Sequence, residues 1–365
     1  MNYKGRQRRL QDTLSAHLLD ALLVTHLPNI FYLCGFSGSA GVLVLTEAES
    51  VFFTDGRYTA QARAEVQGSQ IAIARKGPSV AAAEWLGAHT RRGRRASPVR
   101  VGIEGEYLTV AARTRLSRML PSNLRLREAP PLVERARMVK DAEELQRIRE
   151  AVQLEARLFE RALKVIRPGV RETEVAAEME YAARRAGAEA MSFPTIIASG
   201  KRSSLPHGRA SLAAIPRRGF VVCDFGVILA AYCSDMTRTV HVGRVSAAVR
   251  SAYQAVQEAQ QAALEAVRAG VAVSEVDEAA RKLLKNNGLA KYFTHSTGHG
   301  VGLEIHEAPR VAAGQSEILR PGMVITIEPG VYVPGKWGVR IEDMVAVTEQ
   351  GCEVLTLTSK ELITI

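Results

Sequence analysis

The first third of the chain alternates short apolar runs with polar turns. The runs are LDALLVT at 19–25, AGVLVLT at 40–46 and SVFFTDGRY at 50–58, and the last of them ends at an Asp-Gly turn. Apolar runs of this length between turn residues are typical of buried strands. The pattern therefore predicts a mixed α/β domain over residues 1–130.

A proline pair and a charged stretch follow this domain. Pro130-Pro131 and the charges after it are typical of a join between domains, so residues 131–140 are predicted to be a linker. The stretch from Asp141 to Glu144 has the form of a capping box, which starts a helix. We therefore expect a long helix that ends at Pro168-Gly169, and a second domain over residues 141–365.

The second domain contains an internal repeat. ALKVIRPGVRETEV at 162–175 aligns with ALEAVRAGVAVSEV at 263–276, an offset of 101 residues, and seven of the fourteen positions are identical. Each copy predicts a helix, a glycine turn and a new helix. A single repeat at this separation is too long for a solenoid, so we expect two similar halves related by a pseudo-two-fold axis.

Two aspartates lie in a hairpin predicted for the first half. VVCDFGVILAAYCSDMTRTV predicts strands over 220–228 and 231–240. With a turn centred on Leu229-Ala230, Asp224 would lie directly opposite Asp235. Like charges that face each other across a strand pair are destabilising, so a cation is expected between them.

The second half supplies two further carboxylates. MVITIEPGVYVPGKWGVRIEDMVAV predicts two strands around a turn at Pro334-Gly335. Glu328 follows Asp224 by 104 residues and Glu342 follows Asp235 by 107, close to the repeat offset. The duplication would therefore gather four carboxylates at its own axis. Such a buried cluster needs cations to hold its charges.

A histidine between glycines adds an imidazole to this cluster. In STGHGVGLEIHEAP, we expect Gly298 and Gly300 to let the strand press against bound metals, with His299 as a ligand. Carboxylates with one imidazole are typical of a site for two divalent ions about 3.5–4 Å apart. The imidazole favours manganese first, then cobalt, zinc or iron, over magnesium or calcium.

Composition and charge exclude several other classes. The net charge is +10, but the Arg91–Arg95 basic cluster has no interleaved aromatic residues, so a solvated loop is favoured over a nucleic-acid site. No apolar run is long enough to span a membrane, and the basic N-terminal stretch is not expected to be a signal peptide. The four cysteines lack C-x-x-C spacing, which favours reduced thiols. We therefore expect a cytoplasmic protein with no nucleic-acid or membrane partner.

Taken together, the motifs DFG, YCSDMTRT, GHGVGLEIHE, IEPGVY and VRIEDMV resemble those of the M24 "pita-bread" metallopeptidases, in the same order. YLCGFSGSAG and FTDGRY are similar to the creatinase/prolidase-type N-terminal domain. The resemblance implies an α/β (α+β) fold, with this mixed-sheet domain followed by a pseudo-two-fold catalytic domain. It also implies five metal ligands for two divalent ions: Asp224, Asp235, His299, Glu328 and Glu342.

The resemblance implies a Xaa-Pro aminopeptidase, which hydrolyses the bond between an N-terminal residue and proline through a metal-bridging hydroxide. His207 or His306 would stabilise the oxyanion, and Glu328 would carry a proton to the leaving nitrogen. His295 also matches a motif of the proline-specific peptidases within this family. Arg340, on the same predicted strand face as Glu342, would hold a ligand carboxylate together with Tyr332, or would form a plain structural ion pair.

Two alternatives stay open at this point. A prolidase, restricted to dipeptides, would need a cation for the free carboxylate, which the sequence does not locate. A non-catalytic pita-bread module is disfavoured because all five ligands are present. The expected substrates are short peptides with proline in second position. We also expect a homodimer, in which the N-terminal domain forms one wall of the substrate cleft.

Overall fold

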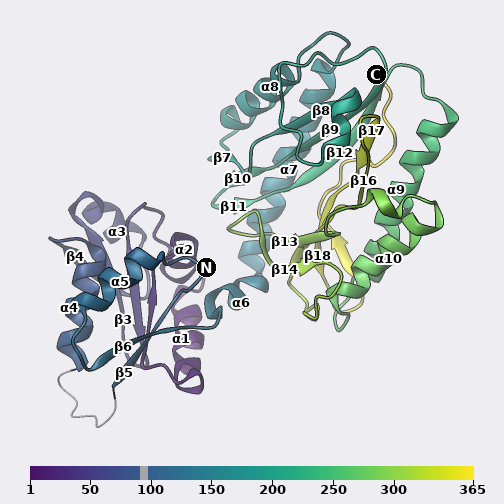
Figure 1. The fold of residues 1–365 in the computed structure, drawn as a ribbon. Coiled ribbons are helices and arrows are strands. Elements are labelled where there is room, and N and C mark those ends of the chain that lie inside the picture. The colour runs from purple at the N-terminus through teal and green to yellow at the C-terminus, as the bar shows by residue number, and fades with distance from the viewer. Residues whose placement is uncertain (91–97) are drawn as a thin grey trace. The chain divides into compact units, whose positions relative to one another are not determined.

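The computed structural model describes residues 1–90 and 98–365, so the whole Arg91–Arg95 cluster lies outside the described residues. The chain divides into two compact units, Met1–Arg137 and Met138–Ile365. In Figure 1 the first runs from purple to blue and the second from teal to yellow. Helix α6 (Leu132–Met138) occupies most of the segment expected to be a linker.

The first unit is built on a six-stranded mixed sheet with the order β4-β3-β2-β1-β5-β6. Its strands are β1 (Ala21–Val24), β2 (Val42–Thr46), β3 (Ser50–Asp55), β4 (Gln70–Ala74), β5 (Val99–Ile103) and β6 (Leu124–Glu128). The three predicted strands are β1 to β3, and they pair antiparallel, whereas β4, β5 and β6 join in parallel. The expectation of a mixed α/β unit is therefore confirmed.

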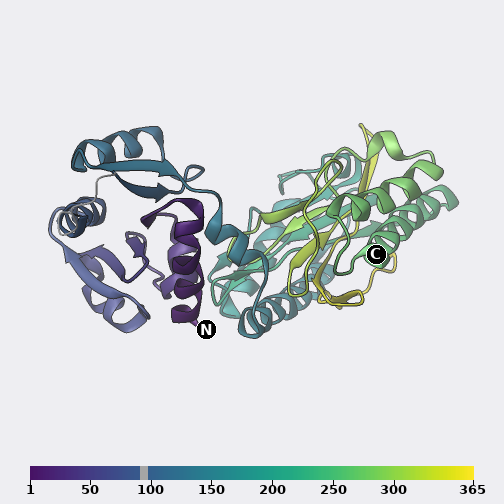
Figure 2. The same cartoon turned by 90° about the horizontal axis from the view of Figure 1, so that it is seen from below.

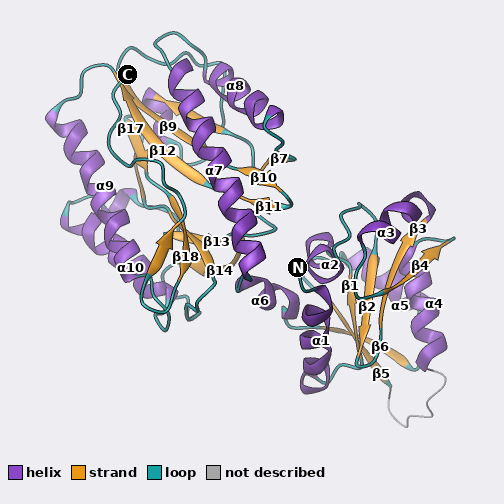
Figure 3. Ribbon diagram, turned by 180° about the vertical axis from the view of Figure 1, so that it is seen from behind, coloured by secondary structure: helices purple, strands orange, loops and turns teal. Residues whose placement is uncertain are grey.

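Helices surround this sheet, and their apolar side chains complete its core. They are α1 (Tyr3–Leu14), α2 (Leu27–Cys34), α3 (Thr59–Glu65), α4 (Pro78–Thr90) and α5 (Val110–Met119). Leu86 of α4 and Leu116 of α5 pack with Val44 and Phe53 of the sheet. Figure 3 shows both helices beside the orange strands.

The second unit contains four long helices in two pairs. They are α7 (Ala142–Val165), α8 (Glu172–Arg185), α9 (Ala247–Ala266) and α10 (Val273–Asn286). The predicted capping box is present, because Asp141 accepts from the amide of Glu144 at 3.0 Å and Glu144 accepts from the amide of Asp141 at 2.9 Å. Helix α7 ends before Pro168, as expected.

The internal repeat is confirmed as a repeated structure. The turns between α7 and α8 and between α9 and α10 contain Gly169 and Gly270, with φ values of +88° and +84°. Only glycine adopts this left-handed conformation without strain. Each glycine amide also donates a 2.9 Å bond to a carbonyl, that of Ile215 or of Leu319 respectively. The shared glycines therefore reflect the same turn in both halves, and α9 and α10 lie side by side in Figure 2.

Each helix pair of the second unit packs against its own sheet. The first sheet has the order β12-β9-β8, and the second has the order β14-β13-β15-β18-β19. These strands are β8 (Ile196–Ser199), β9 (Gly219–Phe225), β12 (Met236–Val242), β13 (Gly298–Gly300), β14 (Glu307–Val311), β15 (Val324–Ile327), β18 (Asp343–Val347) and β19 (Cys352–Val354). Two separate buried clusters result, one under α7 and α8 and one under α9 and α10. The smaller strands are β7 (Ala190–Met191), β10 (Val227–Leu229), β11 (Tyr232–Cys233), β16 (Gly330–Val333) and β17 (Trp337–Arg340).

The predicted register of the first hairpin is wrong. Asp224 lies opposite Thr237, and the turn is formed by Ala230 and Ala231, whose φ values are +48° and +69°. Two consecutive residues with positive φ match the twist of a hairpin, and here they form without the usual Asn-Gly signal. The strand pair is also interrupted, so that Asp235 lies between β11 and β12 rather than inside a strand.

The second carboxylate segment contains four strands rather than the predicted two. The Pro334-Gly335 turn is confirmed, since it joins β16 to β17 with Val333 opposite Trp337. Strands β15 and β18 on either side belong to the five-stranded sheet. Glu328 therefore lies between β15 and β16, and Glu342 lies after the end of β17. The prediction that Arg340 and Glu342 share a strand face is wrong, because Glu342 is not in a strand.

Candidate metal centre

A cavity of about 650 Å³ in the second unit brings the predicted ligands together. Its lining includes all five of them, namely Asp224, Asp235, His299, Glu328 and Glu342, together with His207, His295, His306 and Arg340. The four carboxylates come from strand ends and strand junctions of both halves. The two halves thus meet at this cavity.

His299 points its imidazole at the carboxylates. Donor atoms of Asp235, His299 and Glu342 all lie within 4.8 Å of one another. Nε2 of His299 is 3.5 Å from Oδ2 of Asp235 and 3.6 Å from Oε1 of Glu328. Its Nδ1 lies 3.0 Å from the carbonyl of Gly300, which fixes the N–H there and leaves the Nε2 lone pair facing the carboxylates. Burial lowers the pKa of His299 to about 4, so the ring is neutral at pH 7.

The carboxylates are buried without enough positive charge. Burial raises the pKa of Glu328 to about 8. Burial and then the other carboxylates raise the pKa values of Asp235 and Glu342 well above the usual range. Oδ1 of Asp235 is buried and has no hydrogen-bond partner within the described ranges. Divalent ions would satisfy such a donor set, so these residues fit a metal centre.

Arg340 is held by Asp224 rather than by Glu342. Its Nη2 forms a buried ion pair with Oδ2 of Asp224, and its Nη1 donates to the hydroxyl of Tyr332. That hydroxyl lies 3.0 Å from Nε2 of His295. Burial lowers the pKa of His295 to about 4, so this network contains a neutral imidazole beside a fixed guanidinium.

Thr237 connects the two halves of the site and was not predicted from the sequence. Its hydroxyl donates to Oε2 of Glu342 at 2.7 Å and accepts from Nε of Arg340 at 3.0 Å. Its position in SDMTRT, two residues after Asp235, is the signal that was available. Only the observed register shows that it also lies opposite Asp224.

His306 and His207 lie at the open side of the candidate ligands. The ring of His306 makes an edge contact with His299, with centroids 4.4 Å apart. Burial lowers the pKa of His306, which leaves it neutral near pH 7 and able to donate one N–H. His207 lines the same cavity beside Pro206.

The glycines around His299 allow close packing of strands, whereas the sequence suggested a close approach to metals. A Cβ on Gly298 would lie 1.9 Å from the carbonyl oxygen of Thr326, and one on Gly300 would lie 2.3 Å from that of Ala308. Strand β13 therefore approaches its neighbours more closely than any side chain permits.

Comparisons with known proteins agree with this geometry. Residues 146–349 match the metallopeptidase family M24, and residues 6–139 match the creatinase/prolidase N-terminal domain. The chain belongs to metallopeptidase family M24. This confirms the resemblance and the pita-bread fold, and it makes the protein a hydrolase of a metal-dependent family.

Relatives of this M24 metallopeptidase match over nearly their whole length. An uncharacterized peptidase YqhT of Bacillus subtilis is 39% identical and covers 94% of this chain and 96% of its own. A Xaa-Pro dipeptidase of Pyrococcus horikoshii is 35% identical and covers 98% of both chains. A solved Xaa-Pro dipeptidase from Bacillus anthracis covers all of both chains at 38% identity, with a TM-score of 0.94. A solved X-Pro aminopeptidase from Thermotoga maritima covers 98% of this chain and all of its own at 34% identity, with a TM-score of 0.88. Within residues 1–90 and 98–365, none of the helices combines the length and apolar character that a membrane span requires.

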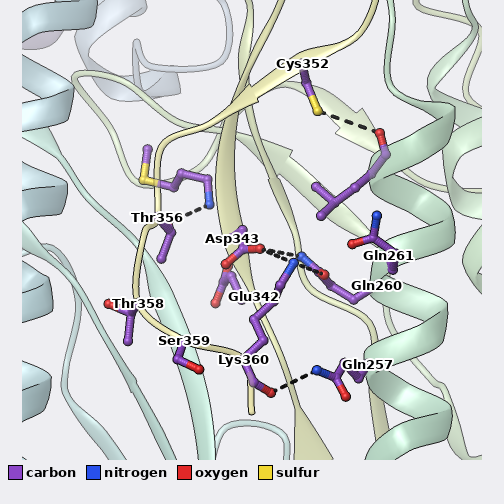
Figure 4. Close-up of polar contacts among 12 residues, drawn as sticks. Gln257, Gln260, Gln261, Glu342, Asp343, Cys352, Thr356, Thr358, Ser359 and Lys360 are labelled. Atoms are coloured by element: carbon purple, nitrogen blue, oxygen red, sulfur yellow. Dashed lines mark hydrogen bonds and ion pairs between the residues drawn. The ribbon is translucent and has the colours of Figure 1, made fainter.

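A second buried acid follows Glu342 in this M24 chain. Asp343 is ion-paired with Arg238 at 2.7 Å and with Lys360 at 3.0 Å, and it accepts from Gln260 at 2.8 Å. Figure 4 shows Gln260 of α9 and Lys360 near the C-terminus converging on it. Arg238 also donates to the carbonyl of Glu342 at 2.5 Å. Asp343 is therefore a compensated structural acid that fixes the backbone at Glu342.

Glu155 of α7 is a buried acid of the opposite kind. The residue is fully buried, and neither of its carboxyl oxygens has a hydrogen-bond partner in the described part of the chain. Burial raises its pKa well above the usual range. Burial therefore favours the protonated, neutral form of this carboxyl. Its position falls on the buried stripe of α7, with Val152 and Phe159, but the sequence does not show that an acid at this position lacks a partner.

Proposed function

We propose that this M24 chain is a Xaa-Pro dipeptidase, the alternative left open by the sequence, rather than the aminopeptidase expected first. The observation that carries the proposal is a pair of arginines, Arg209 and Arg310, in the lining of the cavity. Both residues are exposed, and neither guanidinium has a carboxylate partner among residues 1–90 and 98–365. The relatives named Xaa-Pro dipeptidase support the same activity.

A free cation in this cavity selects for short substrates. In a dipeptide, the carboxylate belongs to the proline that follows the scissile bond, so it lies a few ångströms from the reacting carbonyl. Arg310 is the register partner of His299 in the β13–β14 pair, which places its Cα next to a candidate ligand. A charged hydrogen bond to the substrate carboxylate would hold a dipeptide and would be lost with a longer peptide.

Asp224, Asp235, His299, Glu328 and Glu342 would hold two divalent ions, with manganese expected first. When bound, the ions would supply an activated water at neutral pH and a Lewis acid for the substrate carbonyl. The neutral His299 offers a lone pair without first losing a proton. Arg340 would keep Asp224 ionised and oriented through their buried ion pair.

His306 and His207 would donate N–H groups to the carbonyl oxygen as negative charge develops on it. Glu328, which lines the cavity beside the other candidate ligands, would take a proton from the activated water and deliver it to the leaving nitrogen of proline. That nitrogen belongs to a tertiary amide and carries no hydrogen, so it must gain one to leave as an amine. His295 and Tyr332 would steady Arg340 without touching the substrate.

The deciding experiment compares Ala-Pro, Ala-Pro-Ala and Ala-Pro amide as substrates of the manganese-loaded protein. We expect kcat/KM for the amide and for the tripeptide to fall about 10²-fold below that for Ala-Pro, because a charged hydrogen bond is lost. Arg310→Met should reduce cleavage of Ala-Pro and leave cleavage of the amide unchanged. Arg320→Met, an exposed arginine outside the cavity lining, is the control.

The aminopeptidase is the second candidate, and the fold similarity to the Thermotoga maritima X-Pro aminopeptidase favours it. It is the correct assignment if Ala-Pro-Ala is cleaved as fast as Ala-Pro. Both candidates require metal, so chelators should abolish activity, and manganese or cobalt should restore it. Full activity in the metal-free protein would refute both.

A further inference from the structure

We propose that Asp277 of helix α10 is a positioning residue for the metal centre, acting through Thr297. Asp277 does not line up with any motif of the site, and it lies about twenty residues before His299 in the sequence. The inference rests on the proposed function, because it assumes that His299 and Glu328 hold metal.

Asp277 contacts the segment between His295 and His299 directly. Its Oδ1 accepts from the hydroxyl of Thr297 at 2.7 Å and from the amide of the same residue at 3.2 Å. Asp277 is 1% exposed and Thr297 is fully buried. Hydrogen bonds to a buried, ionised acceptor are stronger than neutral ones and restrict geometry more tightly.

Arg281 completes the clamp one helical turn further along α10. Its Nε and Nη2 form two bonds to Asp277, at 2.6 and 3.0 Å. Nη2 also donates to the carbonyl of His295 at 2.6 Å. The Asp277–Arg281 ion pair therefore bonds to the backbone of this segment at two points, the carbonyl of His295 and the amide of Thr297. His295 in turn meets Tyr332 of the Arg340 network.

Thr297, whose position is fixed by Asp277, also bonds to the backbone of the candidate ligand Glu328. The amide of Glu328 donates to the carbonyl of Thr297 at 2.7 Å. His299 lies two residues along the same strand segment, with its own amide bonded to the hydroxyl of Thr326 at 3.1 Å. One buried carboxylate thus sets the backbone position of two candidate ligands, His299 in β13 and Glu328 between β15 and β16.

The first half of the domain offers a matched control. Thr195 precedes β8 as Thr297 precedes β13, and its hydroxyl donates to Glu180 of α8 at 2.8 Å. The carbonyl of Thr195 bonds to the amide of Ala210, which is not a candidate ligand. Loss of the hydroxyl at Thr195 therefore removes a partly buried bond to the exposed Glu180 and no hydrogen bond to a candidate ligand. The next residue, Ile196, lies opposite Asp224, so Thr195 and Thr297 are matched in their closeness to a candidate ligand.

The test measures Mn²⁺ affinity by calorimetric titration, with thermal unfolding of each metal-free variant. Thr297→Val should weaken Mn²⁺ binding about tenfold or more and lower kcat for Ala-Pro, whereas Thr297→Ser should stay near the wild type. Thr195→Val should lower the unfolding temperature without changing Mn²⁺ affinity. Asp277→Asn should follow Thr297→Val.

The outcomes separate this inference from the proposed function. If the wild type itself binds no Mn²⁺, the proposed function fails. If the wild type binds Mn²⁺ and Thr297→Val binds it equally well while being less stable, Asp277 is merely structural and the inference is overturned. Should Thr297→Val not fold, Arg281→Met carries the test, because Arg281 is 34% exposed and its loss leaves Thr297 intact. Unchanged Mn²⁺ affinity in Arg281→Met would then overturn the inference.

Discussion

At the scale of single residues, the partners of a buried acid decide whether its charge is compensated. Asp343 and Glu155 are both fully buried carboxyls of the second unit. Asp343 meets two cations and an amide, whereas Glu155 has no hydrogen-bond partner among the described residues. The sequence shows both as ordinary acids, because partners brought in from distant segments determine their state. This is why the motif residues could be predicted and Glu155 could not.

Glu155 should make the protein less stable as pH rises. The pKa of Glu155 in the folded protein lies above its value in the unfolded chain, which is about 4.5. As pH rises past that value, the unfolded chain loses this proton before the folded protein does. The free energy of unfolding therefore falls as pH rises. Glu155→Gln removes this effect and should gain stability relative to the wild type, by up to about 1.4 kcal/mol per pH unit. Urea unfolding of metal-free protein at pH 5 and pH 8 measures the difference. Equal differences at both pH values would show that Glu155 is not protonated in the fold, and Glu178→Gln at an exposed ion pair is the control.

Metal binding should release protons from the candidate ligands. Without metal, Glu328 has a pKa of about 8, and the pKa values of Asp235 and Glu342 lie well above their usual range, while His299 has one of about 4. At pH 7 the released protons therefore come from carboxyls, and Mn²⁺ affinity should fall as pH is lowered. Titration in buffers of different ionisation enthalpy counts the protons. A count of zero at pH 7 contradicts this electrostatic picture.

At the scale of elements, the sequence predicted the repeat and the helix starts, but not the strand register. The capping box at Asp141 and the turns at Gly169 and Gly270 use local signals, so the prediction holds. The register of β9 and β12 depends on a turn of two alanines, a residue type without a turn signal. Asp224 and Asp235 were singled out through a register that is wrong, whereas Glu328 and Glu342 followed from the repeat spacing, which does not depend on register.

Gly298 tests whether close strand packing is needed for the site. Its Cβ would meet the carbonyl of Thr326 at 1.9 Å, a backbone atom that cannot move aside cheaply. Gly298→Ala should therefore destabilise the fold by about 1–3 kcal/mol and displace His299, with loss of Mn²⁺ affinity. Gly351→Ala is the control, because the nearest atom to its Cβ would be 4.0 Å away. Stability and metal affinity equal to the wild type in Gly298→Ala would show that β13 has room to shift.

At the scale of the whole molecule, each unit has its own buried core. An apolar cluster that includes Val44, Phe53 and Leu86 lies within the first unit, and two larger clusters lie within the second. Every residue that lines the candidate metal cavity lies between Phe193 and Glu342. The domain order was predictable because motifs follow one another along the chain. The boundary was less so, since Val139 and Lys140 pair with Met323 and Gly322 and belong to the second unit.

A fragment of residues 138–365 should therefore fold and bind Mn²⁺ by itself. It keeps both large cores and the buried ion pair between Lys140 and Glu307, which lies next to His306. A fragment that starts at residue 141 lacks Lys140, so we expect it to bind Mn²⁺ more weakly than the 138–365 fragment.

The family resemblance assigns the first unit a share in catalysis and in a homodimer. The 138–365 fragment should therefore cleave Ala-Pro more slowly than the full chain. The full chain should have twice its monomer mass in solution. Titration calorimetry, a peptidase assay and light scattering measure the three quantities. A fragment as active as the full chain would leave the first unit without a catalytic role, and a monomeric full chain would remove the homodimer.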